Sequence, residues 1–361
     1  MSSAKYSPPS PESTALPPLP LRASPHATLW GGQHLATLAG KALPPDARIG
    51  ETWETEVSCV VADGPLAGAT LGALVERLGE ALTGWRAAQV FGPRFPLLAK
   101  FLDARQALSV QVHPDDSYAA VHEGGKLGKT ETWYILHAEP GAQVTFGLRR
   151  AATRAEVGDA IRADRLEALL ATRPVSAGDV IFVPAGTVHA IGAGIVLYEL
   201  QEYSDVTYRL YDYGRLQPDG TRRALHVDAA LEVMRYLPDV TRVTPVALDD
   251  ATPDAGAWRV LAACRYFVLE EVDIAGEWRG ATTGASCEIV TVLEGACRIS
   301  AAAGACALRL GETAVLPART GAYNITGEAR VVRSYVPEED DESLRRWCAA
   351  QSPASSRSAA E

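Results

Sequence analysis

G-D-V-I-F-V-P-A-G-T-V-H, from Gly178 to His189, indicates the fold more clearly than any other stretch of the chain. An apolar strand leads into a tight turn that contains Pro184 and Gly186, and His189 follows that turn. Upstream, two further motifs carry groups able to bind a metal, namely Q-V-H-P-D-D and E-T-W-Y, which begin at Gln111 and Glu131. The sequence therefore predicts a β-rich metalloprotein.

Four side chains form the predicted ligand set: Gln111, His113, Glu131 and His189. Gln111 and His113 alternate on a strand-like run, so both face the same side, about 7 Å apart. Two imidazoles and a carboxylate suit Zn, Fe or Mn, and the added amide favours a redox-silent ion with open positions. We predict one zinc ion per chain. Because a neutral amide is a poor ligand, Gln111 is either a ligand or a hydrogen-bond partner of one.

Composition narrows the class of protein. The 361 residues are 47% hydrophobic and 22% charged, with 31 Gly and 23 Pro, which is typical of a globular chain with many short strands. A net charge of -10 argues against nucleic acid or an anionic membrane as a partner. Six cysteines without a C-x-x-C pair favour reduced thiols, and neither a signal peptide nor a membrane span is evident. We expect a cytoplasmic protein.

Pro- and Ser-rich ends frame the chain. Residues 1–24 and 339–361 have compositions typical of flexible tails, the second with a short helix at its start. Between them, apolar alternation predicts strands, and helices are expected at residues 71–79, 153–172 and 227–236. The middle helix begins with Thr153 and has Glu156 three residues later, which is the sequence pattern of a capping box.

A weak internal repeat divides the ordered part of the chain. The spacing Gly178-x5-Pro184 recurs in G-E-T-A-V-L-P, residues 311–317, but Ala322 stands where His189 would be. The strand that begins S-C-E at Ser286 likewise echoes the strand at Glu131. We infer two related β-barrels, a metal-binding domain over residues 25–240 and a second domain without metal over residues 241–338.

Longer motifs carry a resemblance to a known family. These are L-W-G-G (from Leu29), G-E-T-W-E (from Gly50), F-P-L-L-A-K-F-L-D-A (from Phe95), S-V-Q-V-H-P-D-D, G-K-T-E-T-W-Y, V-P-A-G-T-V-H-A-I-G and S-D-V-T-Y-R-L-Y-D-Y (from Ser204). Together they resemble the type I phosphomannose isomerases of the cupin superfamily, in their short bacterial form. The likeness is specific from about residue 29 to residue 235 and looser beyond.

The resemblance implies a fold, an activity and a ligand set. It implies a mainly β protein of two cupin-type (jelly-roll) β-barrels with a few satellite helices. It also implies zinc bound by the four predicted ligands, and interconversion of mannose 6-phosphate and fructose 6-phosphate. Arg209 matches the position of the family's catalytic arginine. The chain departs from the family pattern at E-T-E-V-S-C, from Glu54 to Cys59. The resemblance therefore does not predict the shape of the protein around this segment.

Aldose–ketose isomerisation through a cis-enediol needs a proton-transfer group, an electrophile and a phosphate anchor. Glu199 lies on the strand just before Arg209 and is the candidate for proton transfer, because a carboxylate near a metal can be tuned toward neutral pH. The alternative role for Glu199 is to orient a metal ligand. Lys129 either shares the proton transfer or binds phosphate. Since the chain is acidic overall, phosphate needs a local set of polar and basic groups, for which the candidates are Ser109, Lys100 and Arg215.

Two other functions fit the same residues. Two histidines and a glutamate with open positions also describe a non-haem iron cupin enzyme of another class, against which Gln111 and the basic residues argue. A non-catalytic cupin that binds a sugar phosphate is the second alternative. The expected assembly is a monomer or a weak homo-oligomer.

Overall fold

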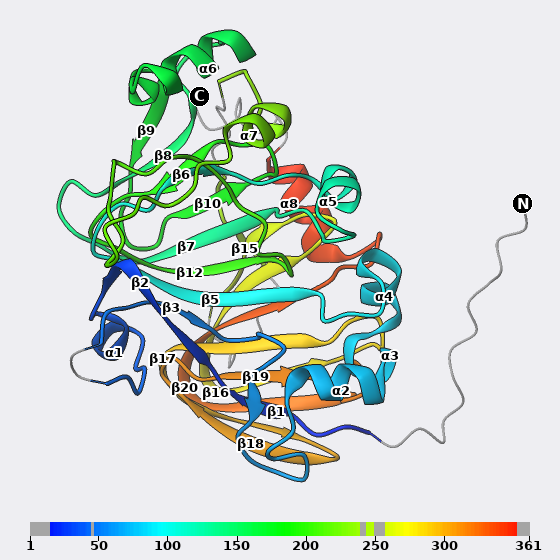
Figure 1. Ribbon diagram of the computed structural model, residues 1–361. Helices are drawn as coiled ribbons and strands as arrows, with labels where there is room; N and C mark the ends of the chain where they lie inside the picture. The colour runs from blue at the N-terminus through cyan, green and yellow to red at the C-terminus, as the bar shows by residue number, and fades with distance from the viewer. Residues whose placement is uncertain (1–14, 45–46, 239–242, 249–256, 352–361) are drawn as a thin grey trace, which may run out of the picture.

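The computed structural model describes residues 15–44, 47–238, 243–248 and 257–351. Its described part is mainly β, as predicted, with twenty strands and eight α-helices. The strands form three sheets that lie one above the other (Figure 1). Within the described residues the strand pairing leaves every sheet open, so none closes on itself as a barrel.

The middle layer is a six-stranded sheet. In spatial order it contains β10 (Val180–Val183), β7 (Glu131–Ala138), β12 (Ile195–Glu202), β5 (Leu97–Ala104), β2 (Ser24–Gly32) and β3 (Ile49–Trp53). Its central strand β12 is buried along its whole length, because both of its faces are covered by another sheet. Side chains alternate between the faces, so Tyr198 points to the second domain while Glu199 points to the opposite side.

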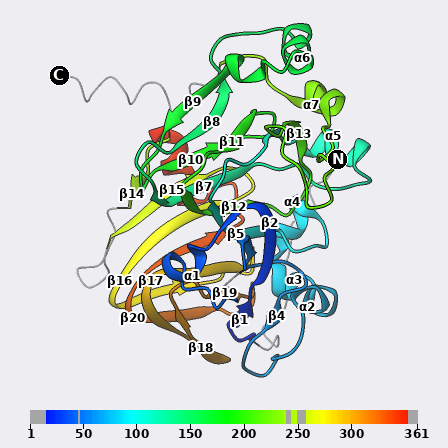
Figure 2. The same cartoon turned by 60° about the vertical axis from the view of Figure 1, so that its left-hand side comes forward.

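A five-stranded sheet covers that opposite side. It contains β13 (Tyr208–Tyr211), β6 (Val110–Val112), β11 (His189–Ile191), β8 (Gln143–Leu148) and β9 (Leu170–Pro174). Between the two sheets lies an apolar core to which Trp133, Phe146 and Leu197 contribute. The outer face of the five-stranded sheet is covered by α6 (Arg154–Arg162) and α7 (Val227–Val233), as Figure 2 shows from the side.

The third layer is a nine-stranded sheet that takes seven strands from the second half of the chain and two from its beginning. It contains β14 (Val246–Ala247), β15 (Trp258–Ala263), β16 (Val268–Ala281), β20 (Ala322–Tyr335), β17 (Glu288–Ala301), β19 (Thr313–Leu316), β1 (Leu19–Arg22) and β4 (Val60–Val61), with β18 (Gly304–Arg309) paired to β17. A large apolar core joins it to the six-stranded sheet. Tyr134 crosses that boundary and donates a hydrogen bond to Glu271.

Helices fill the edges. α1 (Leu35–Leu38) packs beside β5, and α8 (Glu342–Ala350) packs against β15. α2 (Leu71–Leu78), α3 (Glu80–Thr83) and α4 (Trp85–Phe91) lie in succession on one side of the molecule, and α5 (Asp116–His122) follows β6 (Figure 1). No helix in the described ranges has the length and apolar composition needed to cross a membrane.

Two expectations change, and a third falls outside the described residues. Strand β1 and the start of β2 lie inside the predicted tail of residues 1–24, because β1 pairs with β19 of the third sheet. The helix expected over residues 153–172 ends with α6 at Arg162, and Asp164 then adopts a φ of 55°, which an α-helix cannot accommodate. Residues 170–174 form strand β9 instead. The predicted domain boundary at 240–241 lies outside the described residues.

The internal repeat has a structural counterpart. In the first copy Val183, just before Pro184, pairs with Glu131. In the second copy Leu316, just before Pro317, pairs with Glu288 in the same register. Gly178 and Gly311, which open the two copies, both have positive φ, as the turn requires. The matching register supports the inference that the two halves share a local fold.

Candidate metal centre

The four predicted ligands come together between the six- and five-stranded sheets. Glu131 is the first residue of β7, His189 is the first residue of β11, and Gln111 lies in the middle of β6. His189 pairs directly with Gln111 across the sheet, and His113 follows the end of β6. The long-range pairing of strands therefore converts a scattered sequence motif into one cluster.

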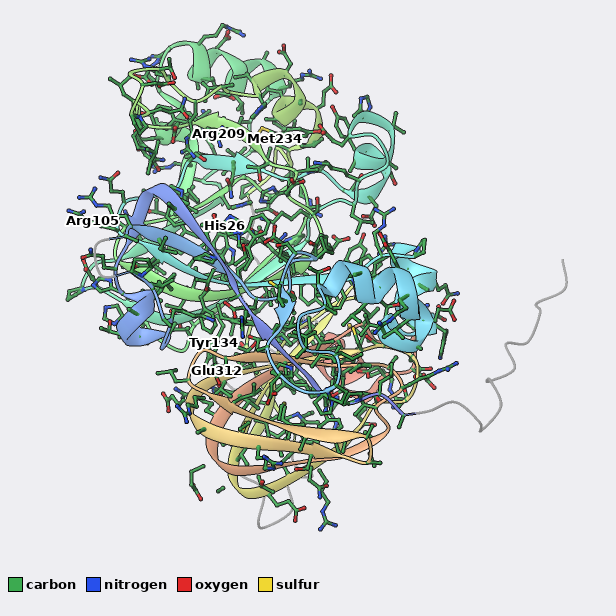
Figure 3. All side chains as sticks on the ribbon, turned by 60° about the horizontal axis from the view of Figure 1, so that its bottom comes forward. His26, Arg105, Tyr134, Arg209, Met234 and Glu312 are labelled. Carbon is green, nitrogen blue, oxygen red and sulfur yellow. The ribbon has the colours of Figure 1, made fainter. Side chains whose placement is uncertain are left out.

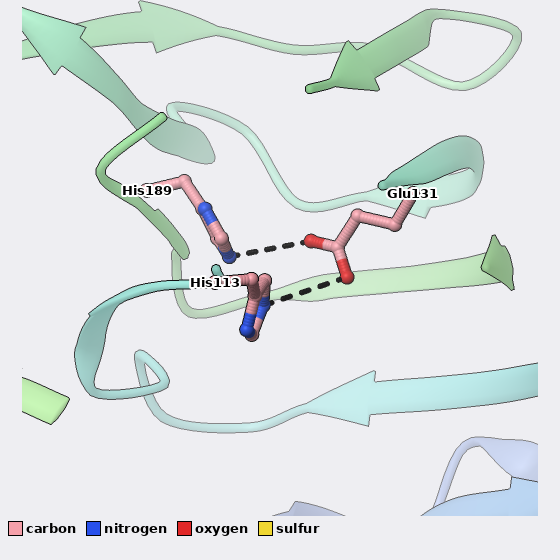
Figure 4. A group of neighbouring side chains, drawn as sticks. All are labelled: His113, Glu131 and His189. Carbon is pink, nitrogen blue, oxygen red and sulfur yellow. Dashed lines mark ion pairs between the residues drawn. The ribbon is translucent and has the colours of Figure 1, made fainter. Parts of the chain in front are cut away.

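The distances within the cluster are short. His189 Nε2 lies 3.2 Å from Glu131 Oε1, and His113 Nε2 lies 3.7 Å from Glu131 Oε2 (Figure 4). The Gln111 amide nitrogen lies 3.3 Å from His189 Nε2. His113, Glu131 and His189 are at most 1% exposed. They are the one group of three or more metal-binding His, Cys, Asp or Glu side chains found in the described residues.

Backbone contacts fix both imidazoles with Nε2 facing the carboxylate. His113 Nδ1 lies 2.8 Å from the carbonyl of Val206, and His189 Nδ1 lies 2.8 Å from that of Thr187. Since a carbonyl only accepts, each Nδ1 carries the proton and donates it, so that Nε2 offers a lone pair. Burial lowers the pKa of His189 to about 4 and holds the pKa of His113 well below its ordinary value, so both rings are neutral at pH 7.

The cluster fits a metal cation. Within the described structure, His113 Nε2 and Glu131 Oε1 are buried without a hydrogen-bond partner, whereas Glu131 Oε2 lies 2.8 Å from the Lys129 ammonium. Imidazole lone pairs and carboxylate oxygens are all acceptors, and the Lys129 ammonium contacts only Glu131 Oε2, so His113 Nε2 and Glu131 Oε1 face other acceptors and a further cation among them would be favourable. Burial also raises the pKa of the Glu131 carboxyl, which a bound cation would oppose. Two histidines, a carboxylate and a nearby amide match the donors that zinc binds.

Charged groups continue from the cluster across the sheet. Lys129 Nζ lies 2.8 Å from Glu131 and 3.9 Å from Glu199, while Lys100 Nζ lies 3.3 Å from Glu199 and 3.6 Å from Glu51. All but Glu51 are almost fully buried. Alternating sign along the row offsets part of the cost of burying these charges.

The pKa of Glu199 shifts in the direction opposite to the one expected. Burial alone would raise it, but Lys129 and Lys100 outweigh burial and hold the pKa below its usual value. The carboxylate is therefore ionised at neutral pH, and the expected tuning toward pH 7 is wrong. Burial would lower the pKa of Lys129, but its ion pairs with Glu131 and Glu199 raise it, so the ammonium stays charged.

Arg209 and Ser109 lie together beside the ligand set. Arg209 pairs with Gln111 across β13 and β6, and its Nε donates to Ser109 Oγ at 3.2 Å. A second guanidinium nitrogen donates to the carbonyl of Ala224 at 3.0 Å. Figure 3 shows Arg209 toward the far end of the molecule from Tyr134, which lies next to the second domain.

Arg215 is a candidate whose hydrogen bonds and ion pairs, among the described residues, all lie outside the ligand set. It forms an ion pair with Asp212 and donates to the carbonyl of Ala107 at 2.6 Å. Its guanidinium lies over the ring of Tyr213 in a cation–π contact. Among the described residues these contacts hold Arg215 on the loop that follows β13.

Comparison with known proteins identifies the family. Residues 19–145 match the profile described as phosphomannose isomerase type I, catalytic domain, and residues 259–336 match mannose-6-phosphate isomerase, cupin domain. A mannose-6-phosphate isomerase of Streptococcus mutans is 36% identical over 325 residues, which cover 89% of this chain and 99% of the relative. The chain belongs to the type I phosphomannose isomerase family.

Further relatives agree with this membership. Mannose-6-phosphate isomerase ManA of Bacillus subtilis is 35% identical over 314 residues, covering 85% of this chain and 95% of the relative. The crystal structure of the mannose 6-phosphate isomerase from Bacillus subtilis superposes with a TM-score of 0.79 at 32% identity, covering 88% of this chain and 99% of that chain.

In this phosphomannose isomerase family member, the structure adds residues that the sequence did not single out. Glu51 accepts a hydrogen bond from the Trp53 indole at 2.6 Å, and the Lys100 ammonium lies 4.6 Å from the Trp53 ring centroid. The indole N–H of Trp133 donates to Glu199 Oε2 at 3.1 Å. The available signal was alternation, since Trp133 lies two residues after Glu131 on the same strand face.

The part of the chain that departs from the family pattern lies on the other face of the sheet. Glu54 forms an ion pair with Lys41 at 2.7 Å and accepts a hydrogen bond from Thr313 of the nine-stranded sheet at 3.2 Å. Cys59 is buried, and burial raises its pKa to about 12. These contacts join the two domains and lie away from the ligand set.

Proposed function

We propose that the chain interconverts mannose 6-phosphate and fructose 6-phosphate with the aid of one zinc ion. The observation that carries the proposal is the enclosed set of two neutral imidazoles and one carboxylate, in a chain that covers its mannose-6-phosphate isomerase relatives almost from end to end. Family membership alone supports the activity. The donor set supports the metal.

Zinc would be held by His113, Glu131 and His189, with Gln111 as the fourth ligand. When bound there, the ion acts as a Lewis acid toward sugar oxygens. The net charge of the site agrees with this assignment. Three cations, Lys100, Lys129 and Arg209, cancel three carboxylates, Glu51, Glu131 and Glu199, so zinc leaves an excess of two positive charges. The phosphate of the substrate carries about two negative charges.

The residues of the chain divide the isomerisation between them. Glu199 takes the proton from C2 of mannose 6-phosphate, and the C–H bonding pair becomes the C1–C2 double bond of a cis-enediol. The same proton returns to C1, while the hydroxyl proton of O2 moves to O1, so that atoms and charge balance. Arg209 faces Gln111 and holds the enediol oxygens, for which a planar guanidinium is suited.

Lys129 is the less suitable proton acceptor, because two carboxylates hold it as a cation. It stabilises negative charge that develops on the substrate. Ser109 and Lys100 are the nearer phosphate contacts in this proposal. Arg215 reaches phosphate only if its ion pair with Asp212 opens.

The proposal also covers the domain organisation, the compartment and the assembly of the protein. The repeated strand register supports two cupin-type domains, of which the second carries no metal. The six cysteines, all in the described part of the chain, form no disulfide, as is typical of a cytoplasmic protein. The proposed assembly is a monomer or a weak homo-oligomer.

A coupled assay for fructose 6-phosphate tests the function. Purified protein is given mannose 6-phosphate before and after treatment with a chelator, and then with zinc added back. The proposal predicts turnover that chelation abolishes and zinc restores. Binding of mannose 6-phosphate without product would favour a sugar-phosphate sensor, and oxygen-dependent turnover with iron would favour another cupin enzyme.

A further inference from the structure

We propose that Trp133 is a positioning residue for the isomerisation: its indole N–H fixes Oε2 of Glu199 and leaves Oε1 as the oxygen that exchanges the proton with the substrate. The inference rests on the proposed function. It assigns a role in the reaction to Trp133, which also belongs to the apolar core between the two sheets.

Trp133 touches both halves of the site. It is fully buried, and its indole nitrogen lies 3.1 Å from Glu199 Oε2. Its ring also meets the His189 imidazole edge-on, with centroids 5.4 Å apart. Trp133 and Glu199 are direct partners across β7 and β12, so the backbone ladder sets their relative position. An indole offers one donor and no acceptor, so it can hold one carboxylate oxygen and nothing else.

The two oxygens of Glu199 are therefore unequal. Oε2 accepts the indole hydrogen bond, whereas Oε1 is buried and its contacts are ionic ones with lysine ammonium groups. Oε1 faces the ammonium groups of Lys100 and Lys129, at 3.3 and 3.9 Å. A carboxylate oxygen has two lone pairs, so Oε1 can still accept a proton or a hydrogen bond from the substrate while it faces these cations.

A carboxylate without such an anchor would rotate about its terminal torsion, which is broad and roughly two-fold. Rotation would exchange the two oxygens and move the negative charge relative to the lysines. The indole N–H prevents this exchange without adding a charge. Geometry at the reacting atom matters because misplacement by about 1 Å can cost about 100-fold in rate.

Trp133→Phe tests the inference in the full-length, zinc-loaded protein. It keeps an aromatic ring and removes the donor. We expect kcat to fall roughly 10- to 100-fold, the value of one hydrogen bond to a charged group. KM should stay within about threefold and zinc should remain at one per chain. The kinetic isotope effect with mannose 6-phosphate deuterated at C2 should rise, because proton transfer becomes the slow step.

Trp258→Phe is the matched control. The Trp258 indole nitrogen is buried but has no hydrogen-bond partner among the described residues, and it lies on β15 of the second domain. Its removal should leave kcat, KM and the isotope effect at parental values. A parallel variant carries benzothienylalanine at position 133, in which sulfur replaces the indole N–H within a ring of nearly the same shape.

The outcomes separate cleanly. Parental kcat in Trp133→Phe, or a lower kcat with an unchanged isotope effect, would overturn the inference. So would loss of zinc, which would place the role of Trp133 at His189. If Trp133→Phe does not fold, the benzothienylalanine variant decides: parental kinetics there would show that packing alone matters. An unmodified protein that makes no fructose 6-phosphate would instead refute the proposed function.

Discussion

His113 shows how one buried side chain can combine several conditions. Its Nδ1 is bound to a backbone carbonyl, its Nε2 faces Glu131, and burial keeps the ring neutral. Neutral imidazole is the form that binds a metal. Sequence spacing predicts His113 as a ligand, but the tautomer depends on Val206, which lies 93 residues further along the chain.

His113→Ala should therefore lose metal and turnover together. Without the His113 imidazole the metal ion loses one of its ligands. The buried Glu131 carboxylate then loses the cation that balances its charge. We expect less than about a tenth of the parental zinc content and of the parental kcat. Zinc is measured by atomic emission after gel filtration, beside the coupled assay. His122→Ala, at an exposed position on α5, is the control and should retain both. A fully active, metal-loaded His113→Ala protein would refute the ligand assignment.

Arg209→Ala should have the opposite pattern. Arg209 contacts Ser109 and the carbonyl of Ala224 but none of the proposed ligands through a hydrogen bond in the described structure. Zinc content should stay parental, while kcat falls by roughly 100- to 1000-fold, as when one oxyanion-stabilising donor is removed. Arg162→Ala on α6 serves as the surface control. Near-parental turnover of Arg209→Ala would show that its proposed role is wrong.

Glu202 predicts a pH dependence of stability. Burial, reinforced by Asp116, raises the pKa of this carboxyl from 4.5 to about 8. Because the folded state holds the proton more tightly, its contribution to stability is complete below pH 4.5 and is lost as the pH rises toward 8. The slope is at most about 1.4 kcal/mol per pH unit.

Glu202→Gln should remove this loss. An amide oxygen can still accept the hydrogen bond that Thr130 N–H donates to Glu202 Oε1 at 2.8 Å, and it carries no charge. The free energy of unfolding, from denaturant titrations, should exceed the parental value at pH 8 and approach it at pH 5. Glu328→Gln, at an exposed site, should follow the parent at both pH values. Equal parental and Glu202→Gln stability at pH 8 would contradict the assignment.

Strand β1 is the element that ties the two halves of the molecule together. Its residues pair with β19 of the second domain on one side and with β4 on the other. Leu19 is 1% exposed and belongs to the core between the six- and nine-stranded sheets. Residues 19–22 thus belong to the sheet of the second domain.

Leu19→Ala should consequently destabilise the whole protein by about 2 to 5 kcal/mol, the cost of truncating a buried leucine. Zinc content and kcat at low temperature should not change, since β1 contributes nothing to the ligand set. Denaturant unfolding monitored by tryptophan fluorescence measures the effect. Leu38→Ala, at a partly exposed position, should cost less than about 1 kcal/mol. A Leu19→Ala protein of parental stability would show that β1 is not a structural tie.

Elements could be predicted from the sequence where local pattern decides them. The apolar strand predicted before the turn at Pro184 is present as β10, and Thr153 caps α6 by accepting from the Glu156 N–H. β1 was missed because its partner β19 lies almost 300 residues away and a four-residue strand has no pattern of its own. Trp133 and Glu51 were missed as site residues because alternation gives a face without saying which side chains meet there.

At the scale of the whole molecule, the proposed metal centre lies in the first half of the chain, and the second half repeats part of its fold. Both halves place a glutamate at the start of a strand in the same register, Glu131 and Glu288. Where the first copy has His189, the second begins β20 with Ala322. Glu288 instead lies 3.2 Å from the guanidinium of Arg333. A side-chain cation thus takes the charge-balancing place in the second domain, and the chain should bind one metal ion.

The central claim is that four side chains hold one zinc ion on which the isomerisation depends. Its most direct test is a titration of metal-free protein with zinc while fructose 6-phosphate formation from mannose 6-phosphate is followed. We predict activity that rises from near zero and reaches its plateau at one equivalent of zinc per chain. Full turnover by the metal-free protein, or a plateau that requires two equivalents, would contradict the account.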